Sequence, residues 1–347
     1  MNYILIMAGG IGSRFWPAST QQRPKQFLDI LGTGRSLLQL TYDRFRKLLP
    51  PEHIYVLTNE RYRSLVQEQL PELAEAQILG EPSRNNTAPC IAYAAFKLHA
   101  LDPEANFVVT PSDQLILKED AFLEKIEQGL RFTASHPALL TLGIQPHRPH
   151  TGYGYIHYEQ TKPVEEGIYP VLAFKEKPDE ERAKTFLASG DYLWNAGIFL
   201  WRAEVILNAF RQNAPEIYEL LQAGAEVYNT EAEGSFLRKQ YPETPSISVD
   251  YAIMEKASSI YTLPADIGWS DLGSWRALYE LQPKDEQENV LISGRLTAQN
   301  ASRCLIKAPA DKRIVLRDLH DYIVVDTEEV LLVYPMEKEQ EIKLLGH

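Results

Sequence analysis

The sequence predicts an α/β protein with a mostly parallel sheet covered by helices, followed by a small β-domain. Two observations support this. Up to about residue 280, strand-like and helix-like stretches alternate along the chain. After about residue 288, short apolar runs recur every 8 to 12 residues or so, with turn residues between them. The alternation is typical of parallel sheets, which collect ligands at the carboxyl ends of their strands.

The predicted elements follow the hydrophobic pattern. Strands are expected at 3–7, 54–57, 77–79, 106–110 and 139–143, and helices at 37–48, 61–70, 88–100 and 122–135. Residues 144–178 are rich in Pro, Gly, Tyr and His, and an irregular stretch of this length is usually functional. Residues 203–240 are expected to be helical, and 337–345 to form a short helix. We therefore expect a large domain over 1–285 and a small one over 286–347.

Composition narrows the class of protein. The 347 residues carry 35 basic and 47 acidic side chains, a net charge of −12, which argues against general nucleic-acid binding. The two cysteines, Cys90 and Cys304, lie far apart and suggest neither a zinc site nor a disulfide framework. No apolar run approaches the roughly 18 residues of a membrane helix. We expect a cytoplasmic protein without membrane or nucleic-acid partners.

A glycine-rich loop follows the first strand. Glycines allow sharp turns and let backbone N–H groups approach an anion, and two cations, Arg14 and Lys25, follow the loop. The loop does not match the dinucleotide-binding pattern G-x-G-x-x-G, because Phe15 occupies the position of the last glycine. It does not match the P-loop pattern either, because Arg14 stands where that pattern requires Gly-Lys-Ser/Thr. The loop indicates a polyphosphate cradle, and a tight turn without a ligand is the alternative. Its candidate residues are Ala8, Gly9, Gly10, Gly12, Ser13, Arg14 and Lys25.

Two carboxylates lie where a magnesium site would need them. Asp113 follows Ser112 just after the buried strand 106–110, and Asp271 lies in a segment with two tryptophans and two glycines. Magnesium is commonly held by one or two carboxylates together with substrate phosphates. Each aspartate has an alternative role as the N-cap of a following helix.

Further polar groups suggest sugar and base contacts. Glu176 and Lys177 lie near a strand end, where alternation would put Lys175 and Lys177 on one face and Glu176 on the other. Asn195 is a polar residue in an apolar strand, and its partner is either a sugar or the backbone. Tyr153-Gly154 suits a sugar ring or a turn. Glu81-Pro82 and Asn86-Thr87 suit a purine edge or a helix cap.

These motifs together resemble the sugar-1-phosphate nucleotidylyltransferases, and most closely the mannose-1-phosphate guanylyltransferases. The similarity covers about residues 3 to 345. It is carried by residues 8–14 with Pro17 and Pro24-Lys25, and by 174–178, 194–199 and 268–275. Residues 15–17, 23–27, 81–82 and 86–89 indicate the guanylyltransferase branch.

The resemblance implies a Rossmann-like, GT-A-like mixed sheet flanked by helices and a small C-terminal left-handed β-helix. It implies a reaction of GTP with mannose 1-phosphate that gives GDP-mannose and diphosphate with Mg²⁺, and we expect a homodimer. Longer bacterial members carry an added isomerase domain, for which this sequence is too short, so we expect no isomerase activity.

The resemblance also implies a role for each candidate. The glycine-loop residues with Ser112 would hold the triphosphate, while Glu81, Pro82, Asn86 and Thr87 would lie by guanine. Catalysis would depend on Arg14, Lys25, Asp113, Lys177 and Asp271, with Asp113 and Asp271 holding the metal. The sugar phosphate would contact Tyr153, Gly154, Glu176, Lys177, Asn195, Gly197 and Asp271.

Three rival classes follow from the same residues. The first is the same chemistry on glucose 1-phosphate with dTTP or UTP. The second is a glycosyltransferase, many of which bind metal through an Asp-x-Asp pair that this sequence lacks. The third is a non-catalytic, oligomerising paralogue, which should have lost the charged residues Arg14, Lys25, Asp113 and Asp271.

Overall fold

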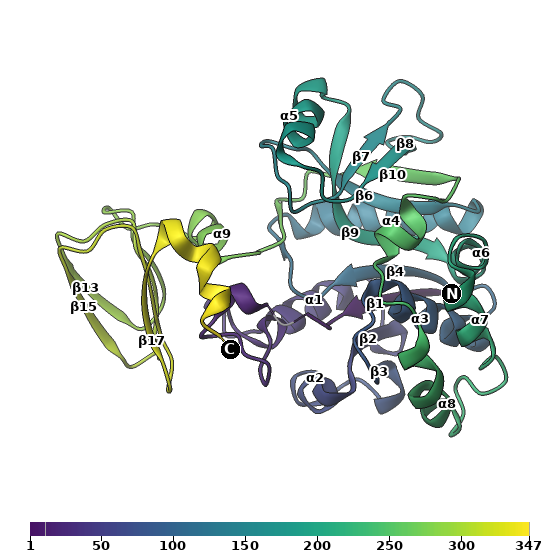
Figure 1. The fold of residues 1–347 in the computed structure, drawn as a ribbon, viewed down its shortest axis with the longest axis horizontal. Helices are drawn as coiled ribbons and strands as arrows, with labels where there is room; N and C mark the ends of the chain where they lie inside the picture. The colour runs from purple at the N-terminus through teal and green to yellow at the C-terminus, as the bar shows by residue number, and fades with distance from the viewer. Residues whose placement is uncertain (11, 347) are drawn as a thin grey trace. The chain divides into compact units, whose positions relative to one another are not determined.

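The computed structural model describes residues 1–10 and 12–346. The chain divides into two compact units (Figure 1). The first unit comprises residues 1–9, 42–111 and 116–269, and the second comprises residues 10–41, 112–115 and those from Ser270 onward. Helix α1 (Leu37–Arg46) and the short strands β5 (Leu115–Ile116) and β11 (Trp269–Ser270) lie where these ranges meet.

The first unit is built on a nine-stranded sheet. In spatial order its strands are β3 (Ile78–Glu81), β2 (Ile54–Asn59), β1 (Asn2–Met7), β4 (Asn106–Pro111), β9 (Tyr192–Arg202), β6 (Leu139–Ile144), β10 (Ile260–Pro264), β8 (Tyr169–Lys175) and β7 (Tyr155–Tyr158). Strands β1, β2, β3 and β4 pair in parallel, as do β6 and β10, whereas β9 runs antiparallel to both β4 and β6. The sheet is therefore mixed, and the expectation of a mostly parallel sheet holds only for its first half.

Helices cover this sheet. They are α2 (Arg63–Gln69), α3 (Thr87–Leu101), α4 (Glu119–Ser135), α5 (Glu180–Ser189), α6 (Ala203–Asn213), α7 (Pro215–Gln222) and α8 (Glu233–Gln240), with the 3₁₀ helix η6 (Tyr241–Glu243) and the π-helix η7 (Asp250–Met254). The α4 helix lies against β4, β6 and β9, while α3 packs against α6 and α7 (Figure 1). Most of α3 is buried because its sequence is apolar almost all round and rich in alanine, which permits close packing.

The second unit contains the β-rich C-terminal part of the chain. Its elements are η1 (Ser13–Phe15), η2 (Lys25–Phe27), α9 (Trp275–Leu281), β12 (Val290–Ser293), β13 (Arg295–Gln299), β14 (Leu305–Lys307), β15 (Arg313–Arg317), β16 (Tyr322–Asp326), β17 (Leu331–Pro335) and the 3₁₀ helix η8 (Met336–Leu344). Strand β14 pairs in parallel with β12 and β16, β13 pairs in parallel with β15, and β17 returns antiparallel to β16.

The core of this unit joins residues that are far apart in sequence. Phe15 packs on Trp275 with ring centroids 4.8 Å apart, and both belong to one buried cluster with Ile323 and Ile342. The glycine-loop region and the C-terminal strands therefore share an apolar core, which burial stabilises. The sequence pattern alone did not show this.

Two further observations concern the whole chain. No helix among residues 1–10 and 12–346 is long and apolar enough to cross a bilayer. Cys90 and Cys304 are free and buried.

Candidate active site

A buried lysine joins the segments of the two predicted aspartates in the second unit. Lys25 opens η2 and is only 3% exposed. Its Nζ donates to Asp113 Oδ2 at 3.1 Å, to the Asp113 carbonyl at 3.0 Å and to the Asp271 carbonyl at 3.2 Å. One ammonium group thus fixes two segments that are 158 residues apart in the chain. The ammonium lies beside the carboxylate of Asp113 and the backbone of Asp271, and such an arrangement suits the charges of a metal-bound phosphate.

The glycine loop packs directly on the stem of this lysine. Gly12 has a φ of +69°, and a Cβ at this position would collide with Lys25 Cβ. Gln26 Nε2 donates to the Gly10 carbonyl at 2.9 Å, which ties the loop to η2. Gly12 is therefore required both by its left-handed backbone and by the space that Lys25 fills.

The helix-cap alternatives for the two aspartates are wrong. The N-cap of α9 is Ser274, whose hydroxyl accepts from Ala277 N. The N-cap position of α4 is Lys118, which lies five residues beyond Asp113. Neither aspartate is therefore the N-cap of the helix that follows it.

The other residues of this unit that are predicted to contact phosphate are neighbours of Gly12 or of Asp113 in the sequence. Ser13 and Arg14 are exposed on η1. Ser112 is buried, and its carbonyl accepts from the Thr41 hydroxyl at 3.2 Å. Within the described part of the chain, no ion pair of Arg14 is seen, so its phosphate role remains a prediction.

The predicted base-binding residues lie in the first unit, at the end of β3 and the start of α3. Burial raises the pKa of the Glu81 carboxyl to about 7, and a hydrogen bond from the Tyr241 hydroxyl to Glu81 Oε1 opposes this rise. Asn86 has a φ of 67° and caps α3 by accepting from Thr87 N at 2.8 Å, so the cap role is real. The Thr87 hydroxyl accepts from Val249 N at 2.9 Å.

The remaining residues of this unit that are predicted to contact the nucleotide either follow β1 or lie next to Glu81 in the sequence. Ala8 N donates to the Leu57 carbonyl at 2.7 Å, which continues the ladder of β1. A Cβ on Gly9 would lie 3.7 Å from Glu81 Oε2, so the Glu81 carboxylate faces the start of the glycine loop. Pro82 follows Glu81 and lines a separate pocket described below.

Three polar side chains of the first unit form a second cluster. Asn195 Nδ2 donates to Asp250 Oδ1 at 2.9 Å, and Asn195 Oδ1 accepts from Gly197 N at 3.1 Å. A Cβ on Gly154 would lie 2.5 Å from Glu176 Oε2 and 3.3 Å from Asn195 Cβ. Burial and the neighbouring Glu176 raise the pKa of Asp250 to about 6. Two carboxylates and an amide around a bare glycine backbone can accept and donate several hydroxyl hydrogen bonds.

The expected alternation at Lys175, Glu176 and Lys177 is wrong. Strand β8 ends at Lys175, and Lys177 has a φ of +46°, which turns the chain out of the extended conformation. As a result Lys177 Nζ reaches Glu176 Oε1 at 2.6 Å, so the two side chains share one side. Glu176 N also donates to Glu255 Oε1 at 3.0 Å, which anchors the turn.

Aromatic rings border this cluster. Tyr153 stacks on His150 with centroids 3.8 Å apart and lies edge-on to Trp194 and Trp269 at 5.1 and 5.2 Å. Tyr153 is held in place by three rings, beside a glycine that permits close approach.

Sequence reasoning missed two residues, Asp250 and Tyr241. Asp250 interrupts the apolar run 249–254 with a charge, and such a residue needs a partner if it is buried. That signal was available. Nothing around Tyr241 in the sequence indicated that it bonds to Glu81, 160 residues away.

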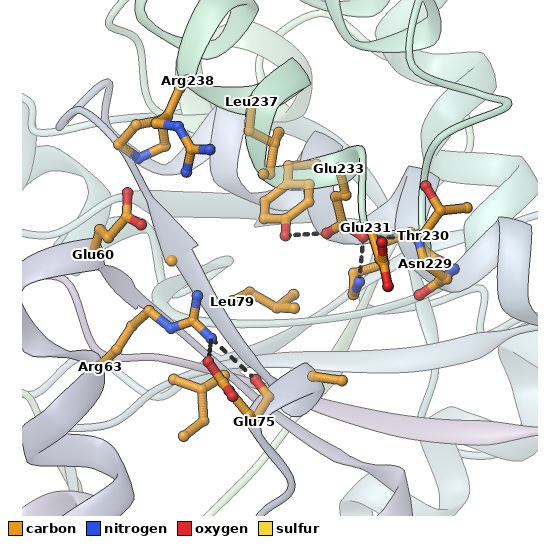
Figure 2. Close-up of a pocket in the computed structure, with 17 residues that line it drawn as sticks. Glu60, Arg63, Glu75, Leu79, Asn229, Thr230, Glu231, Glu233, Leu237 and Arg238 are labelled. Atoms are coloured by element: carbon orange, nitrogen blue, oxygen red, sulfur yellow. Dashed lines mark hydrogen bonds and ion pairs between the residues drawn. The ribbon is translucent and has the colours of Figure 1, made fainter.

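A separate pocket of the first unit has a volume of about 690 Å³ (Figure 2). Buried Glu233 of α8 binds Lys97 Nζ and the Tyr93 hydroxyl, each at 2.6 Å, and Arg63 binds Glu75 at 3.3 Å. This network ties α8 to α3. Pro82 is the single sequence-predicted residue among the described residues that line the pocket.

Comparison with known proteins identifies the class of protein. The nucleotidyl transferase family profile matches residues 3–288. A putative mannose-1-phosphate guanylyltransferase of Vibrio cholerae serotype O1 is 38% identical over 344 residues, which cover 98% of this chain and 72% of the relative. The mannose-1-phosphate guanylyltransferase of Escherichia coli is 38% identical over 345 residues, with the same shares.

A solved structure agrees with these relatives. A crystal structure described as a mannose-1-phosphate geranyltransferase from Thermus thermophilus is 30% identical, with a TM-score of 0.87 over 99% of this chain and 98% of that one. The fold is thus that of a nucleotidyltransferase. The chain belongs to the nucleotidyl transferase family, and it is an enzyme of that class. The predicted resemblance to the mannose-1-phosphate guanylyltransferases is confirmed.

Proposed function

We propose that this chain is a mannose-1-phosphate guanylyltransferase, which converts GTP and α-D-mannose 1-phosphate to GDP-mannose and diphosphate. The observation that carries the proposal is Lys25 holding Asp113 and Asp271, in a family whose relatives bear that name. A phosphate oxygen of mannose 1-phosphate attacks the α-phosphorus of GTP. The bond from the α-phosphorus to the oxygen bridging to the β-phosphate breaks, and diphosphate leaves.

No protein nucleophile is required, so the side chains contribute position and charge. Lys25 and Arg14 neutralise charge on the triphosphate, and the backbone of Gly10, Gly12 and Ser13 donates hydrogen bonds to it. The buried Lys25 ammonium is pre-oriented by its three acceptors and so needs no rearrangement in the transition state.

Asp113 and Asp271 suit a magnesium ion. Both side chains offer carboxylate oxygens, which magnesium prefers as ligands. Lys25 bonds to the segments that carry the two aspartates. No group of three or more Cys, His, Asp or Glu residues that could hold an ion occurs among the residues that the structure describes. The phosphates of GTP would complete the coordination, and the bound ion would offset charge that develops on their oxygens.

The sugar phosphate is assigned to the cluster of the first unit. Glu176 and Asn195 hold hydroxyls of mannose over the bare backbone of Gly154, and Asp250 fixes the Asn195 amide. Lys177, whose side chain is 57% exposed, exchanges its bond with Glu176 for one to the sugar phosphate. Tyr153 and Gly197 border the ring.

Replacing Gly154 by alanine is expected to raise the KM for mannose 1-phosphate by about tenfold or more, with a smaller change in kcat. The new methyl group would lie 2.5 Å from Glu176 Oε2 and must displace that carboxylate. Gly234→Ala, whose methyl group meets nothing closer than 3.5 Å, is the control. Steady-state kinetics at saturating GTP measures the effect, and an unchanged KM in Gly154→Ala would remove Glu176 from the sugar site.

The KM for GTP is expected to rise by about tenfold for each pH unit below 7. Glu81 has its pKa raised to about 7 by burial, so below pH 7 the carboxyl is protonated and no longer accepts from two donors of guanine. Tyr241 and Arg84 face this carboxyl and lower its pKa in part. The pH profile of kcat/KM for GTP measures the effect. The Glu81→Gln variant is the control, because it removes the titration of residue 81 and leaves that of GTP itself. If its pH profile showed the same acid limb as the wild type, the assignment of Glu81 to guanine would be refuted.

A panel of nucleotides and sugar phosphates, scored by diphosphate release, tests the proposed function. GTP with mannose 1-phosphate is expected to give the highest kcat/KM. Faster reaction of glucose 1-phosphate with dTTP or UTP would establish the rival enzyme, and release with no pair would favour a non-catalytic paralogue.

Three finer assignments complete the proposal. The C-terminal strands form a left-handed β-helix, which is supported by parallel partners such as Leu305 and Ile323, or Arg295 and Arg313, that are 18 residues apart. The enzyme works as a homodimer in the cytoplasm. The homodimer and the cytoplasm are carried over as predictions from the sequence.

A further inference from the structure

Tyr241 is a buried residue whose hydroxyl serves a predicted substrate contact. It begins η6 directly after α8, and its side chain is fully buried. Its hydroxyl donates to Glu81 Oε1, and burial next to Glu81 raises the pKa of Tyr241 well above its usual range. The geometry makes the phenol the donor and the Glu81 carboxyl oxygen the acceptor. The protein itself thus fills one of the two acceptor positions of Glu81 Oε1, and the carboxylate keeps its other positions for a ligand.

The second oxygen of Glu81 points elsewhere. Oε2 lies 3.7 Å from the position of a Cβ on Gly9, the residue that opens the glycine loop. Because Tyr241 holds Oε1, the carboxylate cannot rotate freely about its last bond. Oε2 is therefore presented in one direction, toward Gly9, which follows β1 in the same unit.

Buried hydrogen bonds fix Tyr241 relative to the segment of Glu81. Asn85 Nδ2 donates to the carbonyls of Tyr241 and Thr244 at 3.1 and 2.8 Å. On the other side, Glu233 of α8 is bound to Lys97 and Tyr93 of α3 (Figure 2). Tyr241 is thus held at its backbone, at its hydroxyl and through the helix that precedes it.

The chemistry of guanine matches an anchored carboxylate. Guanine offers two neighbouring donors on one edge, N1–H and the 2-amino group, whereas adenine presents an unprotonated N1 and uracil or thymine a single N3–H. A buried carboxylate with a fixed direction selects the base that supplies both donors, because any other base leaves the charge under-bonded. A freely rotating carboxyl would select less strongly.

We propose that Tyr241 is a positioning residue that sets the selectivity for guanine by fixing the carboxylate of Glu81. This inference rests on the proposed function. It adds Tyr241, which acts on the base through Glu81, to the residues that we assign to the base itself.

The test compares GTP with ITP, which lacks the 2-amino group. For Tyr241→Phe, kcat/KM for GTP is expected to fall by about 10- to 30-fold, mainly through KM, with kcat within about threefold. The ratio of kcat/KM for GTP over ITP is expected to fall by about tenfold, because the 2-amino contact depends on the direction of Oε2.

The matched control is Tyr228→Phe. Tyr228 is also buried, its ring lies near that of Tyr93 as Tyr241 does, and its hydroxyl donates to the Leu221 carbonyl at 2.7 Å. Removing that hydroxyl has a similar structural cost but leaves Glu81 untouched. The GTP-over-ITP ratio of Tyr228→Phe is expected to match that of the wild type.

The outcomes separate the inference from the function on which it rests. A wild-type enzyme without activity on GTP would refute the proposed function. Wild-type activity with an unchanged GTP-over-ITP ratio in Tyr241→Phe would overturn the inference alone. If Tyr241→Phe does not fold, Glu81→Gln decides, since Tyr241 can act only through Glu81, and an unchanged ratio there overturns the inference as well.

Discussion

Replacing Lys25 by methionine is expected to lower kcat for diphosphate release by about 10²- to 10³-fold. Methionine fills similar space but removes the ammonium that binds Asp113 and the carbonyl of Asp271. Both segments then lose their common anchor, and the triphosphate loses a buried cation whose charge is little screened. The Asp113 side chain remains 36% exposed, so water can solvate it and the variant should fold.

Lys307→Met is the control for losing a lysine from the same unit. Lys307 Nζ donates to the Asp29 carbonyl at 2.8 Å and touches neither aspartate of the site. Its replacement should cost stability but leave kcat within about threefold of wild type. Thermal unfolding and steady-state kinetics of both variants provide the measurement. Equal kcat losses in the two variants would mean that Lys25 acts through the fold alone.

The second large effect is expected when the carboxylates are neutralised. Asp113→Asn and Asp271→Asn should each lower kcat by about 100-fold or more, while the KM values change less. Each amide keeps the shape of the side chain but loses the charge that a divalent cation requires. The magnesium concentration for half-maximal rate should also rise, because one of two protein ligands is weakened.

Asp29→Asn is the matched control for this pair. The Asp29 carboxylate accepts from Thr33 N and Gly34 N at 2.9 and 2.7 Å in the same unit, whereas Lys25 bonds to Asp113 and Asp271. Its amide variant should keep both kcat and the magnesium requirement. Near-normal turnover in both Asp113→Asn and Asp271→Asn would show that neither residue holds the metal.

The sequence predicted the elements that local pattern determines. The apolar runs at 3–7 and 106–110 became β1 and β4, and the apolar, alanine-rich stretch 88–100 became α3, because burial of such runs depends on their own residues. The direction of β9 was not predictable in this way. Its antiparallel pairing with β4 and β6 depends on contacts with strands that are distant in sequence. The apolar pattern of a strand is the same for both directions, so it does not predict the direction.

The candidate site shows the same division. The residues of the glycine loop and Asp113 follow strand ends, where the rule for parallel sheets places ligands. The turn at Lys177 was missed because a positive φ at a lysine has no sequence signal, and it overrides the alternation of the preceding strand. Tyr241 was missed because its partner Glu81 is remote in the chain, and only the folded structure brings the two together.

The central claim is that an oxygen of the sugar phosphate attacks the α-phosphorus of GTP. It is tested most directly with mannose 1-phosphate that carries ¹⁸O in its phosphoryl oxygens, followed by mass spectrometry of both products. Attack on the α-phosphorus predicts that all of the label appears in GDP-mannose and none in the diphosphate. Label in released inorganic phosphate or in diphosphate would contradict the account.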